Sequence, residues 1–84
     1  MSVVVQVRYF AGAAAAAGLG EERLELPDPL TVADLRAELG RLHPPLAPVL
    51  QVASLLVDGI ASSDATAVLS GPTAVDVLPP FAGG

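Results

Sequence analysis

The last six residues, Pro79-Pro80-Phe81-Ala82-Gly83-Gly84, most constrain what this chain can fold into. They follow Val75-Asp76-Val77-Leu78, a run that is typical of a buried strand. Proline fixes φ near −65° and has no N–H, so Pro79 and Pro80 cannot continue a central strand. They favour an extended, polyproline-like exit. We therefore expect a folded domain over residues 1–78 and an extended tail over residues 79–84.

This tail predicts a function for the chain end. Six extended residues reach about 20 Å, and Gly83 and Gly84, which lack a Cβ, fit a channel too narrow for ordinary side chains. We expect the Gly84 carboxylate to be the working group. The alternative is an ordinary frayed end, because chain ends are commonly disordered and glycine is frequent there.

Composition excludes several other functions. An apolar content of 52% over 84 residues indicates one small folded domain. The chain has no cysteine and a single histidine, His43, which excludes disulfides, thiolate sites and multi-histidine metal clusters. A net charge of −5 with four arginines and no lysine argues against nucleic-acid binding and suits docking on a basic groove of another protein. No stretch is typical of a membrane span or a signal peptide, so we expect a cytoplasmic location.

The first half of the chain predicts two strands and two helices. Residues 3–10 predict a strand, with Val3, Val5, Val7 and Tyr9 on one face, and residues 21–26 predict a second, antiparallel strand. Between them, alanine-rich residues 11–17, closed by Gly18, favour a short helix, with a flexible loop as the alternative. We expect the acidic pair Glu21-Glu22 to be solvated at a loop or strand edge.

The clearest helix begins after Thr31, because Thr31-Val32-Ala33-Asp34 resembles a capping box. It ends near His43, before two prolines, and its apolar stripe comprises Val32, Leu35, Leu39 and Leu42. We interpret His43 as a C-terminal helix residue that complements the dipole, with a catalytic role as the alternative.

The second half predicts strands over residues 52–57 and 75–78. Residues 46–50 favour a helical turn or loop, and residues 61–69 a short strand or loop. Asp58-Gly59 predicts a tight turn, in which Asp58 is structural rather than a metal ligand or general acid. The resulting fold class is α+β, a mixed sheet of four to five strands with one main helix packed across it.

Catalytic motifs are absent from the sequence: it has no nucleophile elbow, phosphate-binding loop or dinucleotide fingerprint. A carrier or substrate with a projecting carboxylate is therefore favoured over a stand-alone enzyme.

Three segments together resemble the ubiquitin-like sulfur-carrier family, and within it the small subunits of molybdopterin synthases. They are Val7-Arg8-Tyr9-Phe10-Ala11, Leu26-Pro27 with Thr31 to Leu35, and Val77 to Gly84. Two turns depart from the family pattern. The family usually has an acidic turn where this chain has Ser70-Gly71-Pro72-Thr73. The Asp58-Gly59 turn is a milder change from the usual Asn-Gly.

The resemblance implies a β-grasp fold and chemistry at Gly84. An E1-like adenylyltransferase would use ATP and Mg²⁺ to adenylate the Gly84 carboxylate, which is then converted to a thiocarboxylate. No cofactor would bind to this chain itself. The tail would enter the large subunit of molybdopterin synthase, whose side chains would transfer the sulfur to the pyranopterin precursor.

The resemblance also implies roles along the tail, where Pro79, Pro80, Phe81, Ala82 and Gly83 would contact the partner. Pro79 and Pro80 would set direction, Gly83 would allow passage, and Phe81 would anchor in a partner pocket unless it folds back on its own sheet. The alternatives are a sulfur carrier for thiazole, cysteine or tRNA thiolation, or a ubiquitin-like modifier. Without lysine, no copy can accept another copy's C-terminus on a lysine.

Overall fold

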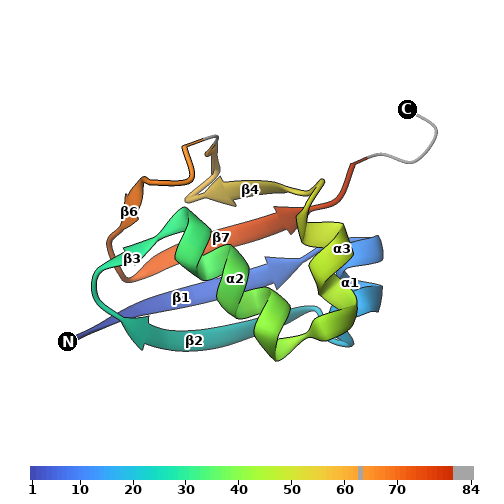
Figure 1. Cartoon of the computed structure of the whole chain (residues 1–84), viewed down its shortest axis with the longest axis horizontal. Coiled ribbons are helices and arrows are strands. Elements are labelled where there is room, and N and C mark those ends of the chain that lie inside the picture. Colours follow the sequence, from blue (N-terminus) through green and yellow to red (C-terminus); the bar gives the residue numbers. More distant parts are fainter. Residues whose placement is uncertain (63, 81–84) are drawn as a thin grey trace.

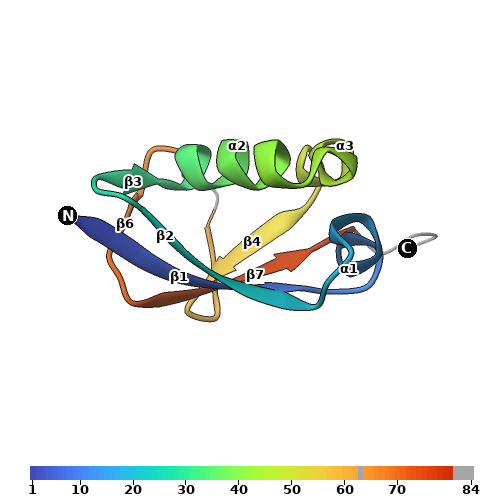
Figure 2. The same cartoon turned by 90° about the horizontal axis from the view of Figure 1, so that it is seen from below.

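A layer of helices covers one face of a mixed β-sheet in the computed structural model, which describes residues 1–62 and 64–80 (Figures 1 and 2). The strands are β1 (Ser2–Tyr9), β2 (Glu21–Pro27), β3 (Leu30–Thr31), β4 (Ser54–Val57), β5 (Ile60–Ala61), β6 (Val68–Leu69) and β7 (Thr73–Leu78). The helices are α1 (Gly12–Ala17), α2 (Val32–Leu42), the 3₁₀ helix η1 (Pro44–Leu46) and α3 (Ala47–Leu50).

The main sheet has five strands in the order β2-β1-β7-β4-β5. β1 and β7 are parallel, while β1–β2, β4–β7 and β4–β5 are antiparallel, so the predicted mixed sheet is confirmed. The period-2 pattern of β1 is also confirmed, because all four side chains of its predicted face are buried: Val3, Val5, Val7 and Tyr9. A separate pair, β3–β6, was not predicted as such.

The predicted short helix is present as α1, so the loop alternative was wrong; the high helix propensity of alanine favours this outcome. Gly18 ends it in the left-handed conformation, with φ 83°, and donates its N–H to the Ala14 carbonyl. The chain then enters β2 at Glu21, as the alternation predicted.

Helix α2 begins with the predicted capping box. The Asp34 N–H donates to Thr31 Oγ1 and the Thr31 N–H donates to Asp34 Oδ2, both at 3.0 Å. Val32, Leu35 and Leu39 are buried. Leu42, the last residue of the predicted apolar stripe, is 36% exposed. The helix ends at Leu42, and buried side chains of η1 and α3, Leu46 and Leu50, fill the core at this end.

The second half follows the predicted elements with shifted strand bounds, and its last strand, β7, begins at Thr73 rather than at residue 75. β4 begins at Ser54 rather than residue 52, and the predicted turn is confirmed by positive φ values at Asp58 (50°) and Gly59 (83°). The weakly patterned segment contains β5 and β6, each of two residues. Residue 63 lies outside the described residues.

Replacement of Gly71 by alanine is expected to destabilise the domain. An added Cβ would lie 2.7 Å from the Val4 nitrogen and 3.0 Å from the Val4 oxygen, and this backbone belongs to β1. Forced overpacking costs about 1–3 kcal/mol, and we expect Gly71→Ala to lower the free energy of unfolding by that amount. The control is Gly20→Ala, where the added Cβ meets nothing within 4 Å. Urea unfolding of both variants measures this, and equal stabilities would contradict the close approach.

Candidate functional site

The candidate site begins where β7 leaves the sheet. β7 is a central strand, held between β1 and β4, and its Val75 and Val77 are fully buried. The strand ends at Leu78, Pro79 is half-buried and Pro80 is exposed. Because neither proline has an N–H, the ladder stops here. The domain thus holds the root of the tail in the strand that has partners on both sides (Figure 1).

Phe10 lies beside this exit. Its N–H donates to the Val77 carbonyl at 3.2 Å, and the residue is 40% exposed. The next residue, Ala11, has φ 50°, a conformation that side chains with a Cβ rarely adopt. The turn after β1 therefore leaves an aromatic residue partly exposed next to the tail root.

The face of the sheet opposite the helices carries an ion pair close to the tail. Figure 2 shows the helices on one side of the sheet only. On the other side, Arg8 of β1 meets Asp76 of β7, its register partner, with Nε–Oδ1 at 2.6 Å and Nη2–Oδ2 at 3.0 Å. The hydrogen bond and then the charge of Asp76 raise the pKa of the Arg8 guanidinium. Asp76 is mostly buried beneath a half-exposed Arg8.

Apolar side chains lie beside this ion pair. Leu56 of β4 is the register partner of Asp76, and Leu78 follows Asp76 by two residues, so strand alternation places all three on the same face. Both leucines are partly exposed. We call this surface, formed by Arg8, Leu56, Asp76 and Leu78, the open sheet face.

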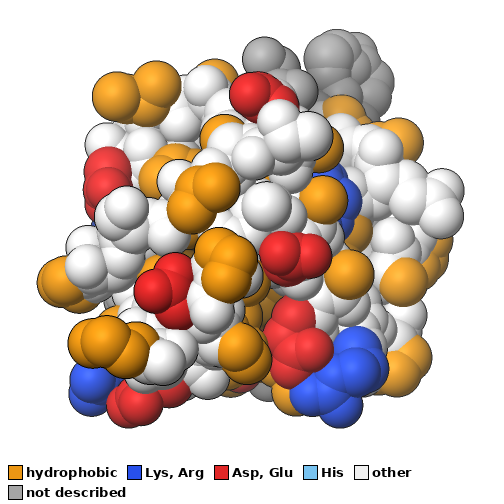
Figure 3. Space-filling model, turned by 60° about the vertical axis from the view of Figure 1, so that its left-hand side comes forward, with side chains coloured by type: hydrophobic (Ala, Val, Ile, Leu, Met, Phe, Trp, Pro, Cys, Tyr) orange, Lys and Arg blue, Asp and Glu red, His pale blue; other side chains and the backbone are white. Residues whose placement is uncertain are grey.

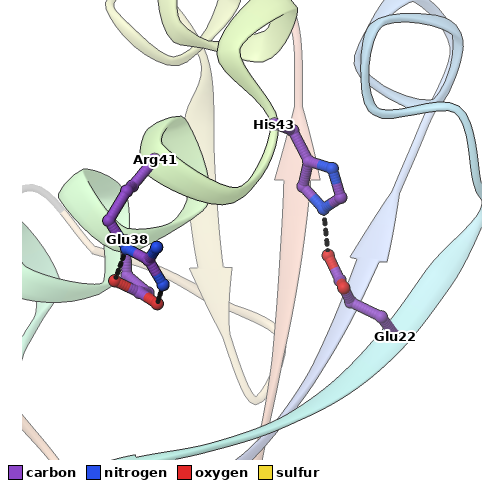
Figure 4. A network of polar contacts seen from close by, with 4 residues as sticks. All are labelled: Glu22, Glu38, Arg41 and His43. Atoms are coloured by element: carbon purple, nitrogen blue, oxygen red, sulfur yellow. Dashed lines mark hydrogen bonds and ion pairs between the residues drawn. The ribbon is translucent and has the colours of Figure 1, made fainter.

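His43 belongs to a polar cluster on the helix side of the sheet. Its Nε2 lies 2.6 Å from Glu22 Oε2, and the Tyr9 hydroxyl donates to the same oxygen at 2.5 Å (Figure 4). Burial, followed by the neighbouring carboxylate, raises the pKa of the Tyr9 phenol. The N–H of His43 also caps α2 by donating to Leu39.

These contacts favour the structural interpretation of His43. Glu22, by contrast, was expected to be solvated, and that expectation was wrong because its carboxylate joins β1, β2 and the end of α2. Figure 4 also shows an ion pair within α2, between Arg41 and Glu38, which precedes it by about one helical turn.

The family is decided by a match that runs from residue 7 to residue 84, nearly the whole chain, to the model described as "ThiS family". The chain belongs to the ThiS family. This is the ubiquitin-like sulfur-carrier family that the sequence resembled, and the match includes the tail residues.

Solved structures agree with this membership. A protein assigned as subunit 1 of a molybdopterin converting factor from Pyrococcus furiosus is 30% identical, covers 95% of this chain and 100% of its own, and superposes with a TM-score of 0.86. SAMP1 from Haloferax volcanii is 24% identical over 96% of this chain and 99% of its own, with a TM-score of 0.84.

A third structure is a complex of subunits 1 and 2 of the molybdopterin-converting factor from Helicobacter pylori 26695. The matching chain is 23% identical over 98% of this chain and 100% of its own, with a TM-score of 0.70. The last two likenesses show the fold alone, and together these neighbours confirm the predicted ubiquitin-like α+β fold of this ThiS-family chain.

The structure places two of the six predicted tail residues. Pro79 and Pro80 follow β7 directly, whereas Phe81, Ala82, Gly83 and Gly84 lie outside the described residues, so their roles stay predictions. Sequence reasoning missed the open sheet face. Its signal was the alternation itself, since Arg8 lies between buried Val7 and Tyr9, and Asp76 lies between two buried valines.

The described residues contain no group of three or more His, Cys, Asp or Glu side chains arranged to hold a metal ion. Within the same ranges, no helix has both the length and the apolar character needed to cross a membrane.

Asp58 has a structural role. Its carboxylate accepts hydrogen bonds from the Ala74 N–H and the Thr73 hydroxyl, both at 2.9 Å, and these donors, the N–H first, lower its pKa below the usual 3.8. It therefore ties the β4–β5 turn to the start of β7, the strand that carries the tail.

We expect this carboxylate to make folding sensitive to acid. Because the pKa is lower in the folded state than in the unfolded state, ionised Asp58 stabilises the fold above the unfolded pKa. That contribution is lost as the pH falls below the usual carboxyl pKa of 3.8 and through the lower folded pKa. Asp58→Asn should show a smaller loss of stability on acidification in denaturant unfolding at pH 7 and pH 3. An unchanged pH slope would contradict this role.

Proposed function

We propose that this ThiS-family chain is the sulfur-donating small subunit of a molybdopterin synthase and that the carboxyl group of Gly84 carries the chemistry. The observation that supports this most is positional. The family match extends through residue 84, and the central strand β7 leads directly into the two prolines that begin the tail. The described domain offers a rigid base for a reactive end rather than a catalytic pocket of its own.

The chemistry proposed for Gly84 has two steps. A carboxylate is a poor electrophile, so an E1-like adenylyltransferase uses ATP and Mg²⁺ to form the acyl-adenylate and release pyrophosphate. A sulfur donor then displaces AMP, which leaves a terminal thiocarboxylate. This sulfur is a nucleophile that forms a bond to the pyranopterin precursor. Water then cleaves the bond between the sulfur and the Gly84 acyl carbon, so each carrier delivers one sulfur atom and returns to a carboxylate.

Delivery requires docking on a large subunit. The Helicobacter pylori structure is a complex of subunits 1 and 2, and this chain would likewise bind a large subunit. The open sheet face would contact the partner together with the tail, because Leu78 of this face directly precedes the tail. In this arrangement Pro79 and Pro80 aim the tail, Phe81 anchors it, and Ala82 and Gly83 pass the narrow part of the channel. Arg8, already neutralised by Asp76, can enter such an interface without leaving an unpaired buried charge.

A second function has support of its own. The matched family carries the name ThiS, and SAMP1 has the same fold. The acceptor can therefore instead be an enzyme of thiazole, cysteine or tRNA thiolation. The chain can also be a ubiquitin-like modifier, whose tail is joined to another protein. All these functions share the activation of Gly84 and differ in what the tail meets afterwards. The partner therefore distinguishes them.

Capture of a pterin-binding large subunit tests the choice of partner. We expect the two chains to co-elute after co-expression, and we expect Leu78→Asp to prevent this because it places a charge in the apolar part of the open sheet face. The matched control is Val68→Asp on β6, where valine is 61% exposed and the strand belongs to the separate β3–β6 pair rather than to the main sheet; it should co-elute normally. Circular dichroism verifies that both variants fold. Co-elution of Leu78→Asp would contradict the docking surface, and failure of the wild-type chain to bind would favour another acceptor.

A further inference from the structure

β2 is an edge strand whose outer backbone groups point away from the sheet. The Tyr9 N–H donates to the Gly20 carbonyl at 2.8 Å and the Asp28 N–H to the Met1 carbonyl at 3.1 Å, which sets the parity of the β1–β2 ladder. Between Gly20 and Asp28, every second residue of β2 hydrogen-bonds to β1 through its backbone. The remaining ones direct their N–H and C=O groups outward, and in β2 these are Glu21, Arg23 and Glu25. Within the described part of the chain, no strand pairs with this edge.

A groove of about 420 Å³ lies along this edge, between β2 and α2. Its lining includes the buried side chains of Leu26 and Leu30, with Pro27 and Pro29 beside them. Leu24, two residues before Leu26, is partly buried on the same face of β2. On α2, the exposed Leu42 follows the groove residue Glu38 by one helical turn, so the apolar surface continues along the strand.

The rim of the groove is acidic. Asp34 and Glu38 line it from α2, and Asp28 is exposed in the turn after β2. Arg41 pairs with Glu38, but three acids against one arginine leave a negative surface. Figure 3 shows one side of the molecule, on which red acidic side chains stand among orange apolar ones and blue side chains lie mainly at the lower margin.

We propose that the β2 edge and this groove bind an extended peptide segment of a partner protein, with apolar β-branched side chains at alternate positions and Arg or Lys at its flanks. An extended backbone can replace the water on the outward N–H and C=O groups by adding a strand to the sheet. Alternate side chains of that strand then point into the groove over Leu26 and Leu30. The basic flanks meet Asp34 and Glu38.

A second copy of this chain fits the surface less well. Two β2 edges would bring acidic rims together, and each chain carries a net charge of −5. The proposed site is also separate from the tail, because β2 lies at the opposite side of β1 from β7. A carrier could therefore hold a partner here while its tail is engaged elsewhere.

The test is a titration of the ¹⁵N-labelled chain with the synthetic peptide Arg-Arg-Val-Thr-Val-Ile-Arg, followed by NMR. We expect amide shifts at Glu21, Arg23, Glu25 and Leu30, and weaker binding of the same peptide with glutamates in place of its arginines. Shifts on the open sheet face, a dimer that forms without peptide, or no shifts at millimolar peptide would each overturn the proposal.

A matched pair of variants tests strand addition itself. Arg23→Pro removes one outward N–H and its ring blocks the edge, while the ladder to β1 keeps its bonds because that N–H does not take part in it. Arg23→Thr removes the same charge but keeps the N–H. We expect Arg23→Pro to bind at least about tenfold more weakly than Arg23→Thr, with both folded by their NMR spectra. Equal affinities would overturn strand addition. The titration does not involve Gly84, so its outcome is independent of the sulfur-carrier proposal.

Discussion

A chain without Gly84 is expected to lose sulfur transfer to the pyranopterin precursor by at least about a thousandfold while its melting temperature stays unchanged. Deletion shortens the tail by about 3.5 Å, whereas misplacement of a reacting group by 1 Å already costs about a hundredfold. The described domain should be unaffected, since β7 ends at Leu78, well before the deleted residue. Reconstituted synthesis with the activating enzyme and the large subunit measures the loss.

Gly84→Ala is the matched control for this deletion. It keeps the length of the tail and its carboxylate but adds a methyl group where the channel is expected to be narrow. We expect an activity between those of the full-length chain and the deletion. Full activity of the deletion variant, which ends at the Gly83 carboxylate, would show that the carboxyl group of Gly84 is not the required reactive group.

The largest expected loss of stability follows from Leu39→Ala. Leu39 is fully buried in the middle of the stripe that packs α2 on the sheet. Removal of a buried leucine side chain costs about 2–5 kcal/mol, a large fraction of the roughly 5–15 kcal/mol that keeps a domain folded. Chemical denaturation should therefore show a much lower midpoint and a measurable unfolded population near physiological temperature.

Leu42→Ala provides the comparison on the same helix. The two leucines belong to one sequence pattern, yet Leu42 is 36% exposed. Its replacement leaves little cavity, and we expect a cost below about 1 kcal/mol. Equal losses for the two variants would contradict the position at which α2 ends.

The elements of this fold were largely predictable because their signals are local. The alternation of β1, the capping box at Thr31 and the Asp58-Gly59 turn each depend on residues within a few positions of one another, and the structure confirms all three. The exposure of Leu42 was not predictable, because the pattern of α2 says nothing about the chain after it. Only the turn through η1 and α3 reveals that Leu46 and Leu50 fill that part of the core.

The features that needed the structure are contacts between distant segments. Glu22 and His43 are 21 residues apart, and no periodicity links them. The ion pair of Arg8 with Asp76 spans 68 residues and depends on the parallel pairing of β1 with β7, which the pattern of strands alone does not specify. The groove beside β2 likewise required the position of α2. The end of the last strand at Pro79 and Pro80 was predictable, because the backbone restriction of proline does not depend on the rest of the fold.

The intact mass of the chain, expressed with its E1-like enzyme and sulfur donor, tests the central claim most directly. The account predicts an increase equal to the replacement of one oxygen by sulfur in a chain that ends at Gly84, and no increase when Gly84 is deleted. A mass that never changes, with no acyl-adenylate formed in the presence of ATP and Mg²⁺, would contradict the assignment of this chain as a sulfur carrier.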